Sequence, residues 1–528
     1  MEKDMKRNTY ALVSALLGVF IGAVGCLIAV RLGSGTKKFD GDYSRWRKLN
    51  LILEQVEANY VDTIDLKAMT DAAVVAALGK LDPHSIYLPP VELEESETEL
   101  AGNFDGIGIQ FNVPNDTAVV LSVIPGGPSE KAGLMQGDRI LKVDEKIIAG
   151  KKTPQDSMVR LMKGPSGSKV KITVKRGGET IPFDITRGKI PVHCVDAAFM
   201  IDSETGYLKL AKFTRTTYIE FISAVANLRA QGMKHLVFDL RENTGGYLDQ
   251  AYMLCNEFLE KGDKVVYMQG LHRSRSDLDA DGKGTLKDVK LSVLIDEGSA
   301  SSSEIFAGAM QDNDRGTIIG RRSFGKGLVQ EPINFTDGSG LRLTVARFYT
   351  PSGRCIQKPY GDDYAYDIYE RYEHGELTDA DSIKVNTDEV YYTVGGRKVY
   401  GGGGIIPDIF VPMDTTRASN FYIQCNRKAT AMRFAGAMFD KYRSELAEID
   451  DFGRLQKWLD SKQLDRQFLD YAASKDGIRP KAGEWEESKE YMMVQIKALV
   501  GRWSKVGEEA FYRFYVDIDK TLQKALEQ

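Results

Sequence analysis

The chain has 528 residues, of which 42% are hydrophobic and 27% are charged, and its net charge at pH 7 is −5. These values predict a globular protein of several domains and argue against a disordered chain. No long basic run is present, so nucleic-acid binding, which needs a concentrated cationic surface, gets no support. The five cysteines form no CxxC pair and the five histidines show no HExxH spacing, so we expect no disulfide framework, no metal site and no cofactor.

The N-terminal region contains a long apolar run, Tyr10–Val30, with no charged residue in its 21 positions. As a helix, such a run can span a hydrocarbon core of about 30 Å. Three basic residues precede it, which predicts a cytoplasmic tail over residues 1–9, a transmembrane signal anchor over residues 10–30 and export of the rest. A cleaved signal peptide and lipidation at Cys26 are the two alternatives.

Residues 31–98 are expected to form a linker followed by a helical region. Apolar residues fall near helical spacing between Trp46 and Val56. The loop Leu81–Pro90 contains His84, a lone loop histidine to which we assign a structural role.

Residues 99–188 change to short strands and turns that glycine and proline separate. The clearest element is a hairpin over Lys169–Ile185, in which apolar residues alternate on both sides of a turn at Gly177 and Gly178. A helix over Pro154–Met162 is expected before it. The pattern predicts a small β-rich domain.

Residues 189–355 alternate between strands and helices, which is the pattern of an α/β domain. The expected elements follow one another as GYLKLAKFT, TYIEFISAVANLRAQG, HLVFDLRE, LDQAYMLCNEFLEKG, KLSVLIDE, SSSEIFAGAMQ, GTIIG and LRLTVARFY. Residues 356–402 are rich in Tyr, Asp, Glu and Gly and are expected to form an insertion on the surface; their GGGG run lacks the GK[ST] context of a phosphate loop. Residues 403–414 return to the core as a strand, and residues 415–528 form a helical region.

Four serines lie close together between the strand KLSVLIDE and the helix SSSEIFAGAMQ: Ser299, Ser301, Ser302 and Ser303. At such a turn the free N–H groups and the dipole of the helix favour negative charge. This suits a serine that attacks a carbonyl and creates an oxyanion. The alternative is structural, because Ser301 and Glu304 fit a capping box. Taken alone, the segment favours capping.

Two further segments add to this evidence. Lys326 stands between two glycines in RRSFGKGLVQ, where a solvated turn lysine is the common case. Neither this segment nor the serine segment contains a histidine, so a nucleophilic serine could use a lysine as its base, provided that burial lowers the pKa of that lysine. In DLRENTGGYL, Gly245 and Gly246 follow a strand and could supply an oxyanion donor or form a plain tight turn.

Seven motifs together carry a resemblance to a known family: in chain order, FDGIGIQF, PGGPSEKAGLMQGDRILKVD, DLRENTGG, SASSSEIFAGA, SFGKGLVQ, TPSGRCIQ and GIIPDIFVP. They resemble the C-terminal processing peptidases, which are Ser–Lys proteases that carry a PDZ domain. Each motif alone is weak, but the ordered set is specific and extends from about residue 45 to residue 412. The resemblance implies an α/β fold with a ClpP/crotonase-like protease core over residues 189–355 and a PDZ domain inserted before it over residues 99–188.

The resemblance also implies the catalytic residues. In the family pattern S-A-S-x-S-E the middle serine is the nucleophile, and it lies twenty-five positions before the lysine of F-G-K-G-x-V-Q. That spacing selects Ser301 and Lys326 in this sequence. Gln330 matches the residue that orients the lysine amine.

The implied oxyanion hole consists of two backbone N–H groups. One belongs to Ser302 and the other to Gly245 or Gly246, between which the sequence does not choose. The chain departs from the family by having Ser302 where alanine is common and Thr244 where proline is common. Neither departure removes a catalytic side chain.

A PDZ domain binds a chain end as an added strand, and successive backbone N–H groups hold the terminal carboxylate. Gly106, Ile107, Gly108 and Ile109 fit that loop and strand, with a plain apolar edge strand as the alternative. The expected ligands are proteins or peptides with apolar C-termini. Together with the run 10–30, this predicts a single-pass protein of the bacterial inner membrane whose catalytic domain lies in the periplasm or cell envelope.

The sequence therefore predicts a membrane-anchored serine endopeptidase that cleaves near protein C-termini through an acyl-enzyme. The helices of residues 43–98 and 415–528 could build a homo-oligomer or dock an adaptor protein. Two alternatives belong to other classes of protein. A PDZ scaffold with an inactive protease domain is disfavoured because all three catalytic side chains are present, and a non-proteolytic acyl hydrolase is disfavoured because no GxSxG motif supports it.

Overall fold

A computed structural model describes most of the chain after its N-terminal segment: residues 47–113, 116–124, 126–361 and 364–528. The expected cytoplasmic tail over residues 1–9, the expected signal anchor over residues 10–30 and Cys26 lie outside the described residues. Among the helices that the structure describes, none is both long and apolar enough to cross a membrane.

The chain divides into two compact units, the first ending at Ala73 and the second beginning at Val74. The described part of the first unit contains α2 (Arg47–Asn59) and the beginning of α3 (Leu66–Leu78), and neither helix has a buried residue. In the second unit, α4 (Pro90–Ala101) follows. The helices predicted for this region are confirmed.

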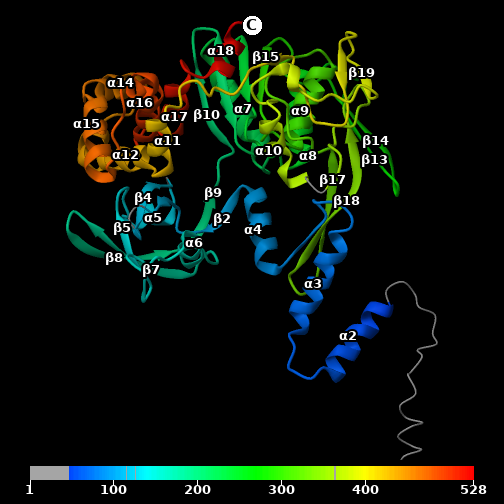
Figure 1. Ribbon diagram of the computed structural model, residues 1–528, viewed down its shortest axis with the longest axis horizontal. Coiled ribbons are helices and arrows are strands. Elements are labelled where there is room, and N and C mark those ends of the chain that lie inside the picture. Colours follow the sequence, from blue (N-terminus) through cyan, green and yellow to red (C-terminus); the bar gives the residue numbers. More distant parts are fainter. Residues whose placement is uncertain (1–46, 114–115, 125, 362–363) are drawn as a thin grey trace, which may run out of the picture. The chain divides into compact units, whose positions relative to one another are not determined.

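The β-rich domain of the second unit contains one six-stranded antiparallel sheet and one two-stranded pair (Figure 1). Its elements are β2 (Asn103–Gly106), β3 (Ile109–Asn112), β4 (Ala118–Val123), α5 (Pro128–Ala132), β5 (Arg139–Val143), β6 (Lys146–Ile147), α6 (Gln155–Met162), β7 (Lys169–Arg176), β8 (Glu179–Thr186) and β9 (Gly188–Pro191). The sheet order is β3-β4-β5-β7-β8 with β6 beside β5, while β2 pairs with β9. The predicted hairpin is confirmed: Gly177 and Gly178 both have positive φ, and Arg176 pairs with Glu179.

The α/β domain is built on a second six-stranded sheet of order β10-β11-β12-β15-β16-β21. The strands are β10 (Val195–Met200), β11 (Thr205–Leu210), β12 (His235–Asp239), β15 (Lys290–Ile295), β16 (Thr317–Gly320) and β21 (Ile409–Phe410). Only the pair β10–β11 is antiparallel. The three connecting helices are α7 (Thr217–Ala230), α8 (Leu248–Phe258) and α9 (Ser302–Asp312), which confirms the predicted alternation.

Both faces of this sheet are covered. On β12, Leu236 and Phe238 face the helices α7, α8 and α9, where Phe238 meets the ring of Phe306. The residue between them, Val237, faces the other side and shares a core with Leu522 of α18 (Lys520–Leu526). Burial on both faces explains why the three middle residues of β12, Leu236, Val237 and Phe238, are all apolar rather than alternately apolar and polar.

A third sheet, which the sequence analysis did not predict as a unit, is antiparallel and five-stranded. Its strands are β1 (Ile86–Leu88), β13 (Lys264–Gly270), β14 (Arg273–Asp279), β17 (Leu328–Asn334) and β18 (Gly340–Tyr349). Because β1 pairs with β18, with Ile86 opposite Arg342, the loop that contains His84 is brought to the edge of the α/β domain.

Residues 356–402 contain short elements: η2 (Tyr364–Tyr366), α10 (Asp367–Glu373), η3 (Ala380–Ser382), β19 (Val390–Tyr392) and β20 (Lys398–Tyr400). The expectation of a surface insertion is wrong for part of this segment. Arg371, Glu376 and Leu377 are buried, and the first two bind Ser323 and Arg322 of the loop between β16 and β17.

The C-terminal region is helical, as predicted, with α11 (Asn420–Arg427), α12 (Thr430–Lys441), α13 (Arg443–Leu446), α14 (Phe452–Asp460), α15 (Leu464–Tyr471), η4 (Ala472–Asp476), α16 (Glu484–Arg502), α17 (Glu508–Tyr515) and α18. Helices α11, α12, α14, α15 and α16 form one cluster (Figure 1) around a core that contains Phe421, Phe434 and Phe468. Helix α18 packs instead against β15 and β16 of the α/β domain.

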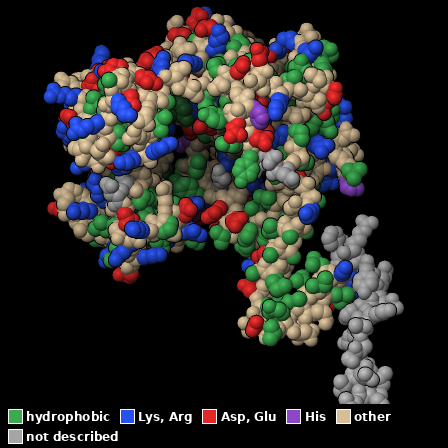
Figure 2. All heavy atoms as spheres, viewed as in Figure 1, with side chains coloured by type: hydrophobic (Ala, Val, Ile, Leu, Met, Phe, Trp, Pro, Cys, Tyr) green, Lys and Arg blue, Asp and Glu red, His purple; other side chains and the backbone are tan. Residues whose placement is uncertain are grey.

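The surface carries mixed charge. Figure 2 shows Lys and Arg side chains interspersed with Asp and Glu over the visible face. Exposed ion pairs such as Lys234–Glu204 and Arg454–Asp450 are of this kind. This face therefore agrees with the lack of a basic run in the sequence.

Candidate active site

Ser301 lies at the turn between β15 and α9, with a φ of 55° and a ψ of −112°. A positive φ on a residue other than glycine costs about 1–3 kcal/mol and is concentrated at functional sites. Helix α9 begins at the next residue, Ser302, and all of its residues are buried. The positive end of a buried helix dipole therefore lies beside Ser301.

The other three serines of the cluster have structural hydrogen bonds. Their hydroxyls donate to backbone carbonyls of the loop after β12: Ser299 to Leu240, Ser302 to Gly246 and Ser303 to Asn243, over 2.8, 2.9 and 2.8 Å. These bonds fasten the serine segment to that loop. They give three of the four serines a role other than attack on a substrate, and this supports Ser301 as the candidate nucleophile.

The loop after β12 contacts the serine segment through its two glycines: Gly245 lies beside Ser301, and the carbonyl of Gly246 accepts from Ser302. The Gly245 N–H donates to Asn243 Oδ1 over 2.9 Å. Within the described parts of the chain, no hydrogen bond is formed by the backbone N–H of Gly246 or of Ser302. Gly246 is therefore the better candidate than Gly245 for the second oxyanion donor.

Gly245→Ala is expected to lower the rate of peptide cleavage by about 100-fold, the cost of displacing a reacting group by about 1 Å. Its φ is 96°, and a Cβ there would stand 2.8 Å from Ser301 Cβ, 2.8 Å from Ser302 N and 2.7 Å from Ala300 O. Initial rates on a peptide substrate measure the effect.

The matched control for Gly245→Ala is Gly436→Ala in α12. A Cβ at Gly436 would meet nothing closer than Trp503, at 3.7 Å, and the φ is ordinary for a helix. We expect the control to keep the full rate. Equal rates for both variants would contradict the close contact between Gly245 and the nucleophile.

Glu304 joins the serine segment to the lysine segment. Its buried carboxylate accepts hydrogen bonds from four donors: Ser301 N at 2.8 Å, Ser323 Oγ at 2.5 Å, Gly325 N at 2.7 Å and Lys326 N at 2.9 Å. The bond from Ser301 N is one half of the capping box that the sequence predicted. The other three, which the sequence pattern did not indicate, connect α9 to a loop about twenty positions further along the chain. Burial raises the pKa of Glu304, and the four hydrogen bonds oppose that rise.

Lys326 and Gln330 face each other at the start of β17. Lys326 Nζ donates to Gln330 Oε1 over 2.9 Å. Burial lowers the pKa of Lys326, and the positive charge of Arg342 lowers it further, while Glu304 and Asp82 act in the opposite direction. A lowered pKa is what a lysine needs to accept a proton.

His84 lies in this site, although the sequence analysis gave it only a structural role. Its carbonyl accepts a hydrogen bond from Gln330 Nε2, and its ring Nε2 lies 2.6 Å from the hydroxyl of Tyr364. Burial lowers the pKa of His84 to about 4, with Lys326 as the next cause. The ring is therefore neutral near pH 7, and the backbone of His84 fixes the amide of Gln330 with its oxygen toward Lys326.

The residues predicted to hold a substrate's C-terminus lie in the β-rich domain, from the end of β2 to the start of β3. Ile107 is buried in the core of this domain. Its carbonyl accepts from Ser129 N, and the carbonyl of Gly108 accepts from Ile124 N. Gly108 has a φ of 76°, and a Cβ there would meet Ile190 at 2.9 Å, so this loop requires glycine.

Comparison with known proteins places both domains. Residues 204–366 match the model of peptidase family S41, residues 106–186 match the PDZ domain, and residues 421–504 match a family of unknown function. The carboxy-terminal-processing protease of Bartonella bacilliformis is 37% identical over 347 residues, which cover 64% of this chain and 78% of that protein.

The chain belongs to peptidase family S41. The family predicted from the seven motifs is thereby confirmed, and the protein is a serine peptidase with a PDZ domain. Carboxy-terminal processing protease CtpA of Bacillus subtilis is 32% identical over 351 residues, covering 66% of this chain and 73% of that protein. Among solved structures, the photosystem II D1 C-terminal processing protease is 28% identical, covers 71% of this chain and 88% of its own, and has a TM-score of 0.37.

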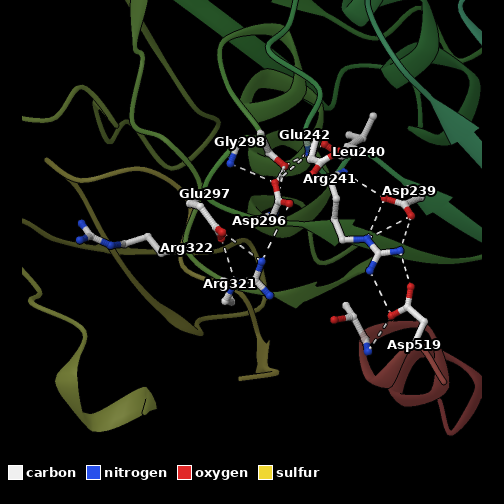
Figure 3. Close-up of polar contacts among 12 residues, drawn as sticks. Asp239, Leu240, Arg241, Glu242, Asp296, Glu297, Gly298, Arg321, Arg322 and Asp519 are labelled. Atoms are coloured by element: carbon white, nitrogen blue, oxygen red, sulfur yellow. Dashed lines mark hydrogen bonds and ion pairs between the residues drawn. The ribbon is translucent and has the colours of Figure 1, made fainter. Parts of the chain in front are cut away.

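A buried ionic network borders the active-site loops of the peptidase. Figure 3 shows Arg241 between Asp239, at the end of β12, and Asp519, at the start of α18. Two residues after Arg241, Asn243 begins the glycine turn. In the same view Asp296 accepts from the N–H groups of Glu242 and Gly298 at 2.8 and 3.0 Å. These contacts hold the ends of β12 and β15 together, where the serine and glycine loops begin.

Proposed function

We propose that this peptidase cleaves proteins near their C-terminal ends through a Ser301 acyl-enzyme, with Lys326 as general base. The observation that carries the proposal is the carboxylate of Glu304, which binds the backbone N–H of both Ser301 and Lys326. One buried group thus holds the proposed nucleophile and the proposed base in a fixed relation. The relatives named carboxy-terminal processing proteases support the choice of substrate.

The proposed chemistry has two halves. Neutral Lys326 takes the hydroxyl proton of Ser301, whose oxygen attacks the carbonyl carbon of the scissile peptide bond. When the tetrahedral intermediate collapses, the bond to nitrogen breaks and Lys326 returns the proton to the leaving amine. Lys326 then takes a proton from water, and the hydroxide attacks the carbonyl carbon of the Ser301 ester. When this second tetrahedral intermediate collapses, the bond to Ser301 Oγ breaks and Lys326 returns its proton to that oxygen, while the acid product releases its own proton to solvent and leaves as a carboxylate.

Two groups support the reaction without exchanging protons. The N–H groups of Ser302 and Gly246 donate to the oxyanion, and fixed donors of this kind need little reorganisation during the reaction. Gln330 accepts from Lys326 Nζ and thereby directs the amine. No metal or cofactor takes part in this scheme.

The proposed recognition step uses the PDZ domain. A substrate C-terminus adds as a strand beside β3, with its carboxylate at Gly106, Ile107, Gly108 and Ile109 and an apolar side chain in the adjacent core. The protease core in this proposal has a ClpP/crotonase-like fold. Residues 10–30 anchor the chain in the bacterial inner membrane, and the active site lies in the periplasm or cell envelope. The uncharged run of 21 residues supports this part of the proposal. A homo-oligomer or an adaptor protein remains part of the proposal for the helical regions.

The test compares two unstructured protein substrates that differ only in their last residues, apolar in one and acidic in the other. The full chain is expected to cleave the apolar-tailed substrate at least about 10-fold faster, the usual range for one apolar contact in a specificity pocket. The difference should lie in KM. Equal rates on both tails would contradict selection by the C-terminus, while leaving the catalytic assignment standing.

A further inference from the structure

The segment that contains α10 binds the loop that carries Lys326. Arg371 of α10 is buried, and its guanidinium donates to the carbonyls of Ser323 and Phe324 over 2.8 and 3.1 Å. These carbonyls lie three and two residues before Lys326, respectively. The planar fork of an arginine can bind two neighbouring carbonyls at once, which the single amine of a lysine cannot do in the same geometry.

Arg371 is itself held by an anion. Asp367 Oδ2, one helical turn earlier, lies 2.9 Å from Arg371 Nη2 and 3.0 Å from Lys358 Nζ. Lys358 Nζ stands 4.1 Å from the centre of the Phe324 ring and 4.2 Å from that of Tyr364. The side chain of Phe324 and its carbonyl are therefore both fixed by the same group of charged residues.

A second route connects the same segment to Gln330. The hydroxyl of Tyr364 lies 3.3 Å from Gln357 Nε2 and 2.6 Å from His84 Nε2. Gln357 Oε1 accepts from Gly327 N over 2.9 Å, on the far side of Lys326. The carbonyl of His84 accepts from Gln330. Both ends of the lysine loop are thus fastened to the segment between β18 and β21.

The loop needs such support because its own sequence gives it little rigidity. Lys326 stands between Gly325, whose φ is 91°, and Gly327, and glycine has more backbone freedom than any other residue. For proton transfer, Lys326 must bring its amine within hydrogen-bonding reach of Ser301. An error of about 1 Å in such a position costs about 100-fold in rate.

We propose that Arg371 is a positioning residue for the general base: by binding the carbonyls of Ser323 and Phe324, it sets where Lys326 stands relative to Ser301. The segment around α10 then supports catalysis by fixing the backbone of the loop that contains Lys326. This inference rests on the proposed function, since it assigns Arg371 a part in the reaction of Ser301 and Lys326.

The test uses the full chain and four variants: Arg371→Met, Arg371→Lys, Asp367→Asn and the control Arg454→Met. Met fills a similar length without a donor, and Asp367→Asn weakens the hold on Arg371 without removing it. Arg454 is exposed and pairs with Asp450 four residues away, so its loss should leave cleavage unchanged. The measured quantities are kcat and KM on the apolar-tailed substrate, the pH profile of kcat, and the thermal unfolding temperature.

We expect Arg371→Met to lower kcat by about 100-fold with KM within about twofold of wild type. The kcat of Arg371→Lys should lie between those of wild type and Arg371→Met, because the lysine amine can reach one of the two carbonyls. The activity of wild type should rise with pH as Lys326 loses its proton, and the charged groups around that amine are Glu304, Arg342, Asp82 and the titratable His84. A displaced Lys326 is more hydrated, so the acid limb of the profile should move to higher pH in Arg371→Met.

A purely structural role would lower the unfolding temperature and the amount of active enzyme without moving the acid limb. The proposal is overturned if folded Arg371→Met keeps a kcat within about threefold of wild type, or loses kcat with an unmoved acid limb. If Arg371→Met does not fold, the kcat and the acid limb of Asp367→Asn decide instead whether the proposal stands. Ser301→Ala in the same assay distinguishes failure of the proposed function from failure of the role assigned to Arg371. If Ser301→Ala cleaves as wild type does, the proposed function fails; if it is inactive, the kcat and the acid limb of Arg371→Met decide the role of Arg371.

Discussion

Lys326→Arg is expected to abolish cleavage, on the order of 10⁴-fold or more, although the positive charge is kept. A guanidinium does not lose its proton at any working pH, so it cannot accept the hydroxyl proton of Ser301. Lys326→Ala and Ser301→Ala should fall to the same residual rate, because residues that act as one unit are not additive. Progress curves on the apolar-tailed substrate measure all three variants.

The matched control is Lys384→Arg, an exposed lysine of the segment after α10, which should keep the wild-type rate. Binding of the substrate provides a second control, since the PDZ domain is intact in every variant and the inactive chains should still bind the apolar tail. A Lys326→Arg variant that cleaves within about tenfold of wild type would remove lysine as the base and leave Ser301 in need of another one.

Glu304→Ala is expected to destabilise the peptidase core and to abolish activity. It leaves the N–H groups of Ser301, Gly325 and Lys326 unpaired in a buried place, at about 1–3 kcal/mol each. A total of about 3 kcal/mol lowers the unfolding temperature of a domain of this size by roughly 6–12 °C. Differential scanning calorimetry of the full chain measures the shift of the transition that belongs to the core.

Glu304→Gln separates activity from stability. The four groups that bind this side chain donate hydrogen bonds, and the amide nitrogen of a glutamine is also a donor, so at least one contact must be lost. We expect Glu304→Gln to unfold closer to wild type than Glu304→Ala and yet to lose most of its kcat. Glu490→Ala, which removes an exposed partner of Arg417, is the neutral control. Full activity in Glu304→Gln would contradict the role of this carboxylate in holding the two loops.

The elements that were predicted well from the sequence are those whose own pattern of apolar and polar residues indicates which of their faces are buried. The middle of β12 is continuously apolar and β15 is buried from its second residue onward because both faces of the sheet are covered, whereas β7 alternates because one of its faces is exposed. The resemblance selected Ser301 and Lys326 by their spacing in the sequence. In the structure, the carboxylate of Glu304 accepts hydrogen bonds from the backbone N–H groups of both residues. The assignment of catalytic roles to these two residues stays a prediction.

The elements that sequence missed depend on distant partners. Strand β14 has the sequence RSRSDLD and is almost wholly exposed, so nothing in it indicates pairing with β13. Helix α10 reads DIYERYE, which is typical of a solvated helix, and the burial of Arg371 follows only from the carbonyls of a loop about fifty positions earlier. His84 was missed for the same reason, because its link to Gln330 spans 246 positions and runs through a backbone carbonyl.

The measurement that tests the central claim most directly is to identify the residue modified by a fluorophosphonate, which reacts with activated serine hydroxyls. The full chain is treated with the reagent, and the modified peptide is located by mass spectrometry. We predict a single adduct on Ser301, absent in Lys326→Ala and slowed in Arg371→Met. An adduct on Ser299, Ser302 or Ser303, or equal labelling of Ser301 in Lys326→Ala, would contradict catalysis by Ser301 with Lys326 as its base.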